Sequence, residues 1–484
     1  MTLSGALSNA LSGLNAASRS AQVTASNLSN AMTPGYGPRT IELGANGLGA
    51  HGGVAVLGTT RHVNPGLLSE VRIATAARAE TDEKAGVHAR LESLIGLPTD
   101  PASLGATITR FESTLIAAAS RPDLAERLGA VVQSAGDVAD GFKRVSDGVQ
   151  SMRGEADRYI ASDVEDLNAL LSQVRDINLQ ITASTVGGRD TSALEDQRQV
   201  LIDSIAEIVP VKEMQRDLGA VALFTPGGAI LLDGAAAQVG FMATNVIAPH
   251  MTRAGGELSG LTINGRPVAT DTVTGPMRGG RLGALFDVRD EIAPNVQAQV
   301  DALARDLVER FEGTGLDATR AAGDPGLFTD NGAVVAPGNE TGLSGRLSLN
   351  DAVIPDSGGA LWRLRDGLGA VVPGPVGNGA LLQNMASTLS AGRIPASGAF
   401  GPAAMSAAGL QSGLLGQIAT DRNASELGQS FAAARFEAAN SQLLAEGVDS
   451  DQEMQRLMLI EQAYAANARL LQTVGDMFDA LMRI

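Results

Sequence analysis

Apolar residues recur every three or four positions at the start of the chain, a spacing typical of one face of an α-helix. The residues between them are mostly Ser, Asn, Gln and Thr, and Arg19 is the only charged side chain among the first 38 residues. Prolines and glycines within 34–38 end the pattern. We therefore predict an N-terminal helix within 1–40 whose outer face has too little charge to stand alone in water. Its apolar positions are Leu3, Leu7, Leu11, Leu14, Ala17, Ala21, Ala25 and Leu28.

The clearest pattern lies at the other end of the chain, in a predicted helix over 451–484 that Asp449 or Ser450 can cap. Two series of residues there repeat every seven positions, which indicates a coiled-coil seam about 50 Å long. The series are Leu457, Tyr464, Leu471 and Phe478, and Ile460, Asn467, Val474 and Leu481. Antiparallel pairing of the two terminal stripes, or stacking against neighbouring copies, would bury both. Both ends of the chain then belong to one domain.

Between the ends, helical spacing alternates with β-prone and irregular sequence. The segment 41–210 is predicted to be the first part of a helical domain, and 211–280 an inserted β-rich domain with a turn at Asn264-Gly265. A helix returns within 281–313. The stretch 314–400 is rich in Gly, Pro and Asp and is interpreted as irregular, and 401–450 returns to the helical domain. The predicted fold is mainly α with an inserted β-rich domain, elongated and multidomain, with a long helical bundle and paired terminal helices.

Composition supports several modest folded units rather than one thick core. The chain has 484 residues, of which 44% are hydrophobic but only 3% aromatic. A net charge of −17 disfavours nucleic acid as a partner, and no stretch is long and apolar enough to predict a membrane helix. The first 30 residues do not resemble a cleaved secretory signal. Cysteine is absent, which excludes disulfides and thiolate metal sites.

Residues that could carry chemistry do not form a recognisable site. The four histidines, His51, His62, His88 and His250, are far apart and lack metal-ligand spacing. Glycine pairs such as Gly227-Gly228 do not precede Lys-Ser/Thr, and carboxylate pairs such as Glu195-Asp196 lie on predicted solvated helix faces. We expect no catalytic, cofactor-binding or metal-binding residues.

Two short segments resemble a known family. The residues Ala25 to Asn30, followed by Thr33-Pro34-Gly35-Tyr36, resemble the N-terminal motif shared by bacterial flagellar rod, hook and hook-associated proteins. The C-terminal segment from Glu446, and above all 461–468 and 477–481, resembles the hook-associated protein 1 family of the hook–filament junction. The run Leu194 to Ile202 is similar to that family's helix before its β-rich insertion. After Tyr36, Gly37-Pro38 departs from the usual motif.

The resemblance implies a structural protein without cofactor, exported through the flagellar type III channel without signal cleavage and located outside the cell at the junction. It also implies four kinds of partner: hook protein, the second junction protein, further copies of itself, and an export chaperone on the C-terminal helix. The implied subunit-interface residues at the N-terminal end are Leu3, Leu7, Leu11, Leu14, Asn27, Leu28, Asn30, Pro34, Gly35 and Tyr36. At the C-terminal end they are the two seven-residue series of the predicted seam.

Three alternatives remain open from the sequence. A hook or distal rod subunit shares the motif from Asn27 to Tyr36. A soluble enzyme with helical dimerisation ends would show a cleft of clustered titratable groups. A cytoplasmic coiled-coil scaffold would not be secreted.

Overall fold

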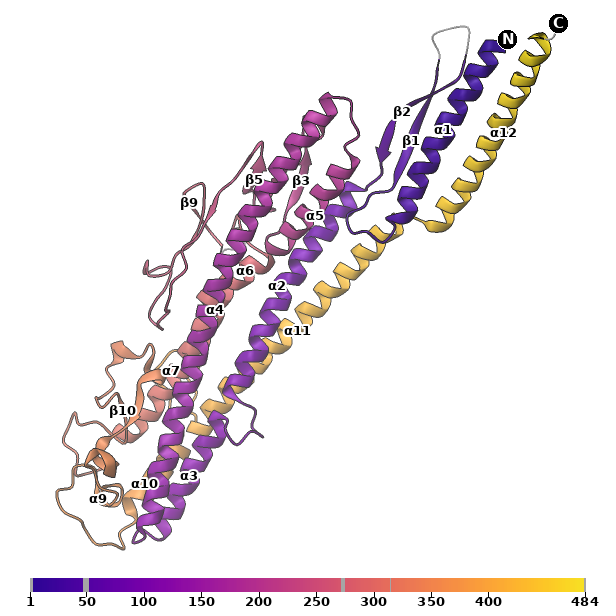
Figure 1. Cartoon of the computed structure of the whole chain (residues 1–484). Coiled ribbons are helices and arrows are strands. Elements are labelled where there is room, and N and C mark those ends of the chain that lie inside the picture. The colour runs from indigo at the N-terminus through magenta and orange to yellow at the C-terminus, as the bar shows by residue number, and fades with distance from the viewer. Residues whose placement is uncertain (1–2, 47–51, 271–274, 314, 483–484) are drawn as a thin grey trace.

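The computed structural model describes residues 3–46, 52–270, 275–313 and 315–482. These residues form an elongated, mainly helical molecule with a small strand-containing region on one side (Figure 1). The fold class predicted from the sequence is thereby confirmed. The division into domains stays a prediction.

The two terminal helices lie side by side and antiparallel at one end of the molecule, with both chain ends at its tip (Figure 1). Helix α1 spans Leu3–Ser29 and α12 spans Ser450–Met482. The cap of α12 is Asp449, whose carboxylate accepts hydrogen bonds from the backbone N–H groups of Asp451 and Gln452. We call α1 and α12 the terminal pair.

A β-hairpin that the sequence pattern did not predict follows α1. Strands β1 (Arg39–Ala45) and β2 (Val54–Arg61) pair antiparallel and lie beside α1. Most of the hairpin lies in the range 41–210, which the sequence predicts to be the first part of a helical domain. Its apolar alternation is short and is interrupted by glycines, so the spacing alone gives too weak a signal.

Five helices form the long part of the molecule, which we call the helical body. They are α2 (Pro65–Ile95), α3 (Leu104–Ser120), α4 (Ala125–Val186), α5 (Ser192–Ile208) and α11 (Ala407–Ala445). Helix α4 has 62 residues, a length of about 90 Å, and touches most other elements of the body. The side chain of Asn64 caps α2. The core is a continuous layer of Leu, Val, Ile and Ala, as the low aromatic content predicts.

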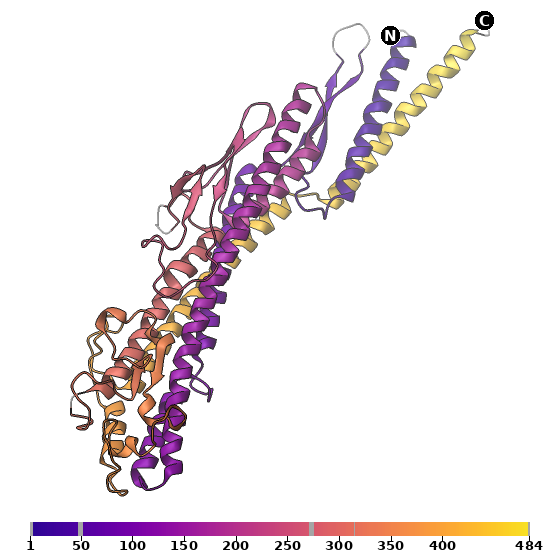
Figure 2. The ribbon, with the colours of Figure 1, turned by 60° about the vertical axis from the view of Figure 1, so that its left-hand side comes forward.

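The predicted β-rich segment contains two small antiparallel sheets packed beside α4 (Figure 2). The first contains β3 (Lys212–Gln215), β4 (Val221–Phe224), β5 (Ile230–Asp233) and β6 (Ala235–Ala236). The second contains β7 (Val239–Gly240), β8 (Leu261–Ile263) and β9 (Arg266–Val268). The turn between β8 and β9 has positive φ at both Asn264 and Gly265, which explains that sequence pair.

The returning helix is divided by a short π-helical segment. Helix α6 (Gly280–Asp287) passes through residues Val288–Ile292 into α7 (Ala293–Glu312). The π-helical segment carries Arg289, which is fully buried and forms an ion pair with the equally buried Asp157 of α4 at 2.7 Å. The pair joins the returning helix to α4.

The segment predicted to be irregular is rich in loops but not without structure. Strands β10 (Phe328–Asp330) and β11 (Leu347–Leu349) pair, and short helices include α8 (Leu343–Arg346) and α9 (Arg363–Asp366). Helix α10 (Ala380–Ser390), which packs on α3, was not expected from the sequence. Three rings, of Phe111, Phe311 and Phe328, form a cluster that joins this region to α3 and α7.

Candidate subunit interface at the terminal helices

Helix α1 turns its small residues, and not its leucines, toward its neighbours in the same chain. Its buried residues are Gly5, Ala10, Ala16, Ala17, Thr24 and Asn27. Of the predicted leucine stripe, Leu11 is 52% exposed and Leu28 is exposed, while Leu3, Leu7 and Leu14 are half-buried. The expected antiparallel pairing of the chain ends is therefore present. The leucine stripe that motivated it is only partly buried by this pairing.

Helix α1 closely approaches α12 at Gly13. A Cβ atom added there would lie 2.8 Å from the side-chain amide of Asn467 on α12. Any larger side chain at this position would require the side chain of Asn467 to move. Asn467, a member of the seven-residue series, thus lies against α1 within the chain.

A second polar contact joins the two helices near the motif. Asn27 is fully buried, and its Nδ2 donates to Glu453 Oε1 at 3.0 Å and to the carbonyl oxygen of Arg39 at 2.8 Å. Its Oδ1 accepts from the Tyr36 hydroxyl at 2.8 Å and from the Arg39 N–H at 3.0 Å. All hydrogen-bonding positions of the amide point to partners. The two contacts, Gly13 with Asn467 and Asn27 with Glu453, are fourteen residues apart on each helix, so they fix one register.

Helix α12 buries few side chains. Val474 is buried, and Leu457, Ile460, Asn467 and Leu471 of the predicted seam are half-buried. The remaining members of the seam, Tyr464, Phe478 and Leu481, are exposed. Their position within one chain is thereby known, and their role between subunits stays a prediction.

A second apolar stripe on α12 was not expected from the sequence. It consists of Leu459, Ala463, Ala466, Leu470 and Met477, all exposed and spaced by three, four or seven residues. At 100° per residue this stripe is turned roughly a quarter of a circle from the seam. The same periodicity would have revealed it, but the stronger leucine and aromatic series obscured it. We call it the outer stripe.

The motif loop joins the terminal pair to the helical body. Asn30 Nδ2 donates to the Ser26 carbonyl oxygen at 2.9 Å, and the loop then turns through Pro34 and Gly35. Gly35 has a φ of +77°, and a Cβ there would meet Val200 of α5 at 2.6 Å. The glycine of the motif is therefore needed both for the turn and for the close approach to α5.

One carboxylate fastens this loop and the hairpin to α5. Asp196 accepts from Arg61 Nε at 2.7 Å and from the Gly37 N–H at 3.1 Å, and it also pairs with Arg39. The guanidinium of Arg39 lies over the Tyr36 ring, 4.8 Å from its centroid. Asp196 thus connects α5 to the motif loop and to both strands of the hairpin.

A cleft of about 880 Å³ opens beside this joint, between the motif loop, α2, α5 and the end of α11. Burial raises the pKa of Asp203 in the cleft wall, against the opposing effect of Arg72. Arg72 Nε donates to Asp203 at 2.6 Å, and Arg72 Nη1 donates to Glu213 at 2.7 Å. Arg72 and Asp203 of the wall are therefore paired with each other.

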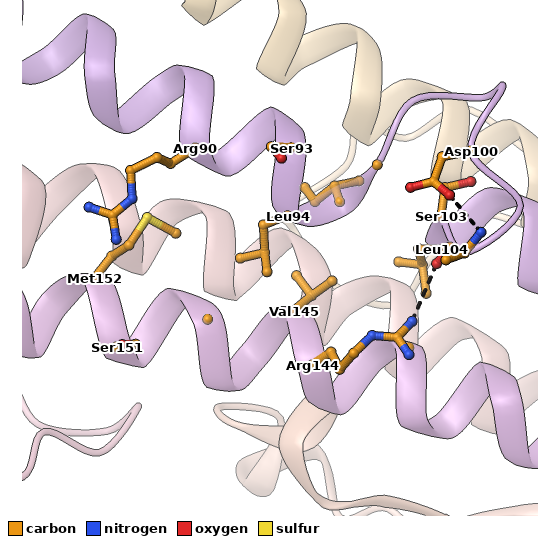
Figure 3. A pocket seen from close by; sticks show the side chains of 15 residues that line it. Arg90, Ser93, Leu94, Asp100, Ser103, Leu104, Arg144, Val145, Ser151 and Met152 are labelled. Atoms are coloured by element: carbon orange, nitrogen blue, oxygen red, sulfur yellow. Dashed lines mark hydrogen bonds between the residues drawn. The ribbon is translucent and has the colours of Figure 1, made fainter.

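A second cavity, of about 510 Å³, lies in the helical body between α2 and α4 (Figure 3). Leu94, Val145 and Met152 form much of its wall. Its two arginines are engaged, because Arg90 pairs with Glu155 and Arg144 Nη2 donates to the Ala102 carbonyl oxygen at 3.3 Å. The cavity is therefore best explained as imperfect packing between helices.

The described part of the chain contains no group of three or more His, Asp or Glu side chains placed to hold a metal ion. His62, His88 and His250 lie on different elements, and His51 falls outside the described residues. None of the helices in the described ranges is long and apolar enough to cross a bilayer.

Comparisons with known proteins match both ends and the centre of the chain. A family model described as the helical domain of flagellar hook-associated protein FlgK matches residues 88–328. A model of the C-terminal part of the flagellar basal body rod FlgEFG proteins matches 441–484. A model of flagella basal body rod protein matches 7–36. The last two ranges contain most of α1 and all of α12.

The related proteins carry one name, and two of them match along the full length. Flagellar hook-associated protein 1 of Bacillus subtilis is 22% identical over 98% of this chain and 97% of its own length. That of Escherichia coli is 24% identical over the whole of both chains. That of Salmonella typhimurium is 27% identical over 49% of this chain and 44% of its own. A solved structure of the flagellar hook junction protein FlgK from Burkholderia pseudomallei is 21% identical, with a TM-score of 0.44, over 54% of this chain and 46% of that one.

Proposed function

We propose that this chain, which belongs to the family of flagellar hook-associated protein 1, enters the flagellum by packing its terminal pair against further copies of itself. As a member of that family it is a structural subunit of the hook–filament junction, and its place is the bacterial flagellum. The terminal helices are proposed to make the contacts on which that role depends.

The observation that carries the proposal is the unburied apolar surface of the terminal pair. The outer stripe of α12 is exposed in one chain. Leu11 and Leu28 of the leucine stripe of α1 are exposed as well, and its other leucines are half-buried. Large apolar side chains each contribute about 1.5–3 kcal/mol when fully buried. Half a dozen of them could therefore offset the association cost of about 4–15 kcal/mol. Within the described ranges, a single chain leaves these faces to solvent.

Helix α12 lies along α1 with few fully buried side chains, which also supports delivery through a narrow channel. Among the described residues of α12 only Glu453 and Val474 are buried, so little apolar area holds this helix to the rest of the chain. Isolated helices are marginally stable until packing holds them. We infer that the ends open for type III export without signal cleavage, that a chaperone covers α12 beforehand, and that assembly outside the cell orders the ends.

The remaining proposed partners lie on either side of the assembled subunits. Hook protein would adjoin one side and the second junction protein the other. We propose no cofactor and no catalysis. In the described part of the chain, the cavity of about 880 Å³ is a joint between elements, and that of about 510 Å³ is a packing defect with engaged arginines.

The direct test is a charge placed on the leucine stripe. Leu11→Asp should leave the helix content of the dilute monomer unchanged and abolish incorporation into flagella, because Leu11 is exposed until a neighbour covers it. Ser8→Asp, also exposed on α1 but outside the stripe, is the matched control and should assemble. Normal assembly of the Leu11 variant would overturn the proposal.

Two further measurements separate this role from its nearest alternative. The ends of the dilute monomer should be protease-sensitive, and resistance of both termini would count against assembly-coupled ordering. Deletion of the gene should leave hooks intact while flagellin is lost to the medium. Loss of the hooks themselves would instead favour a hook or distal rod subunit.

A further inference from the structure

In its C-terminal half, helix α11 packs against α2 with a single face. Gln429 Nε2 donates to Asp82 at 2.9 Å, Arg422 pairs with Glu92, and Arg78 lies 4.9 Å from the centroid of the Phe436 ring. The α11 residues in these contacts are spaced by seven, as a helix-to-helix seam requires. This face of α11 is satisfied by the chain itself.

The opposite face is apolar and open. Leu427 is 61% exposed and Phe431 is 75% exposed, in a chain with few aromatic residues. At 100° per residue, both lie about half a turn from the α2-facing positions. The stripe is about 30 Å long and holds no charge, whereas a solvated helix face normally carries charged residues. Its smaller members, also exposed, are Ala424, Ala434, Ala438 and Ala445.

Charges border the stripe with opposite signs on its two edges. Glu437 and Glu426, which pairs with Arg422 at 2.8 Å, lie along one edge, and Arg435 lies along the other. Such borders suit a helix that has its own acidic and basic edges and meets this one in a fixed orientation. The alanines allow that helix to approach closely. An anionic lipid surface would be repelled by the acidic edge and by the net charge of −17.

The position of the stripe identifies the occupant. Helices α11 and α12 follow each other along one edge of the molecule, outside α2 and α1 respectively (Figure 1). A copy that covers the outer stripe of α12 is therefore placed to continue along α11. We propose that the exposed face of α11, centred on Leu427 and Phe431, is a second contact between copies of this chain. The inference rests on the proposed assembly through the terminal pair and extends it into the helical body.

Photo-crosslinking can identify what covers the stripe. Since the chain lacks cysteine, Phe431→Cys introduces its only thiol, to which a maleimide–benzophenone probe can be attached. In assembled flagella we expect an adduct of twice the 49.5 kDa chain mass, with a peptide of this chain at the crosslink. The dilute monomer should give none. Leu470→Cys with the same probe reports on the outer stripe of α12.

The two probes distinguish the inference from the function it rests on. Adducts between copies at both positions support both statements. An adduct between copies at 470 with none at 431, or with a different protein at 431, overturns the inference and leaves the proposed function standing. No adduct between copies at either position overturns both.

A pair of charge variants provides a second measurement. Phe431→Asp should fold with unchanged helix content, because its side chain is mostly in solvent, and should reduce incorporation into flagella at least tenfold. Ser430→Asp adds the same charge one residue away, at an exposed position off the stripe, and should assemble normally. Equal assembly of the two variants would overturn the inference.

Discussion

The amide of Asn27 donates a hydrogen bond to the carboxylate of Glu453 across 426 positions of sequence, at a site from which solvent is excluded. The same amide holds Tyr36 and both backbone groups of Arg39. One side chain thus joins the first helix, the loop that follows it and the last helix. Because each polar atom of the amide has a partner, the contact specifies register more than it adds stability.

Replacement of this asparagine by aspartate tests that role. Asn27→Asp places two carboxylates within hydrogen-bond distance and removes the donor to the Arg39 carbonyl, at a cost of about 2–4 kcal/mol to docking of the terminal pair. We expect faster amide hydrogen exchange in α12 and earlier cleavage by proteases at the chain ends. Adding Glu453→Gln should restore part of the protection. It removes the repulsion between the two carboxylates, but it does not restore the hydrogen bond to the Arg39 carbonyl oxygen. An unchanged exchange pattern would mean that this contact does not hold the helices.

The contact at Gly13 gives a second, steric prediction. Gly13→Val would force a side chain into the space held by Asn467 and should weaken the terminal pair by about 1–3 kcal/mol. Ser18→Val, at an exposed position of the same helix, is the matched control, because it adds the same side chain where no neighbour in the chain is displaced. Circular dichroism and hydrogen exchange in α1 of the dilute monomer measure the difference between them. If both variants behave alike, Gly13 is not a close contact in solution.

The carboxylate of Asp196 is expected to determine how firmly the motif loop and the hairpin are held to α5. Asp196→Asn removes two ion pairs that are largely shielded from water and should lower the opening free energy at the Gly37 N–H by about 1–3 kcal/mol. Hydrogen exchange at that amide measures the effect. Asp176→Asn breaks an exposed pair with Arg175 and should change stability by less than about 0.5 kcal/mol. Similar exchange in both variants would show that the joint is held elsewhere.

The helical body should lose stability on mild acidification through His88. Burial lowers the pKa of His88 below its ordinary value of 6.5, with Asp421 opposing the shift and Lys84 adding to it. The unfolded chain then binds a proton more readily than the folded one, so stability is fully present above pH 6.5 and declines as the pH falls from there. His88→Gln should show a shallower decline of the thermal midpoint between about pH 6.5 and 5. An identical slope in both proteins would contradict the assignment.

Periodicity predicted the main helices, the β-prone insertion and the return of the chain to the helical body. It succeeded because each long helix buries a regular stripe, as Leu167, Leu171 and Val174 do on α4. It failed to say which stripe faces the chain's own core. On α1 the leucines suggested the packed face, yet Gly13 and Ala10 form it, because close helix contact favours small residues over large ones.

The sequence indicated which helices form the candidate interface, but it did not indicate all the residues that hold them together. The motif residues Asn27 and Tyr36 were found by resemblance, but the involvement of Arg39 and Asp196 depends on contacts between segments far apart in sequence. The hairpin and α10 were missed because both are short and lie beside Gly-rich sequence, where spacing is a weak signal. Outward stripes such as that of Phe431 became recognisable only once the inward faces were known.

The uninterrupted length of α4 has a mechanical consequence for a subunit of the hook–filament junction. A rod of about 90 Å acts as a lever, so a tilt of about 5° at one end displaces the other by roughly 8 Å. A small change in angle at one end of α4 is thereby magnified at the other end. Bending between hook and filament would then move each subunit as a rigid body, with little bending inside any one molecule.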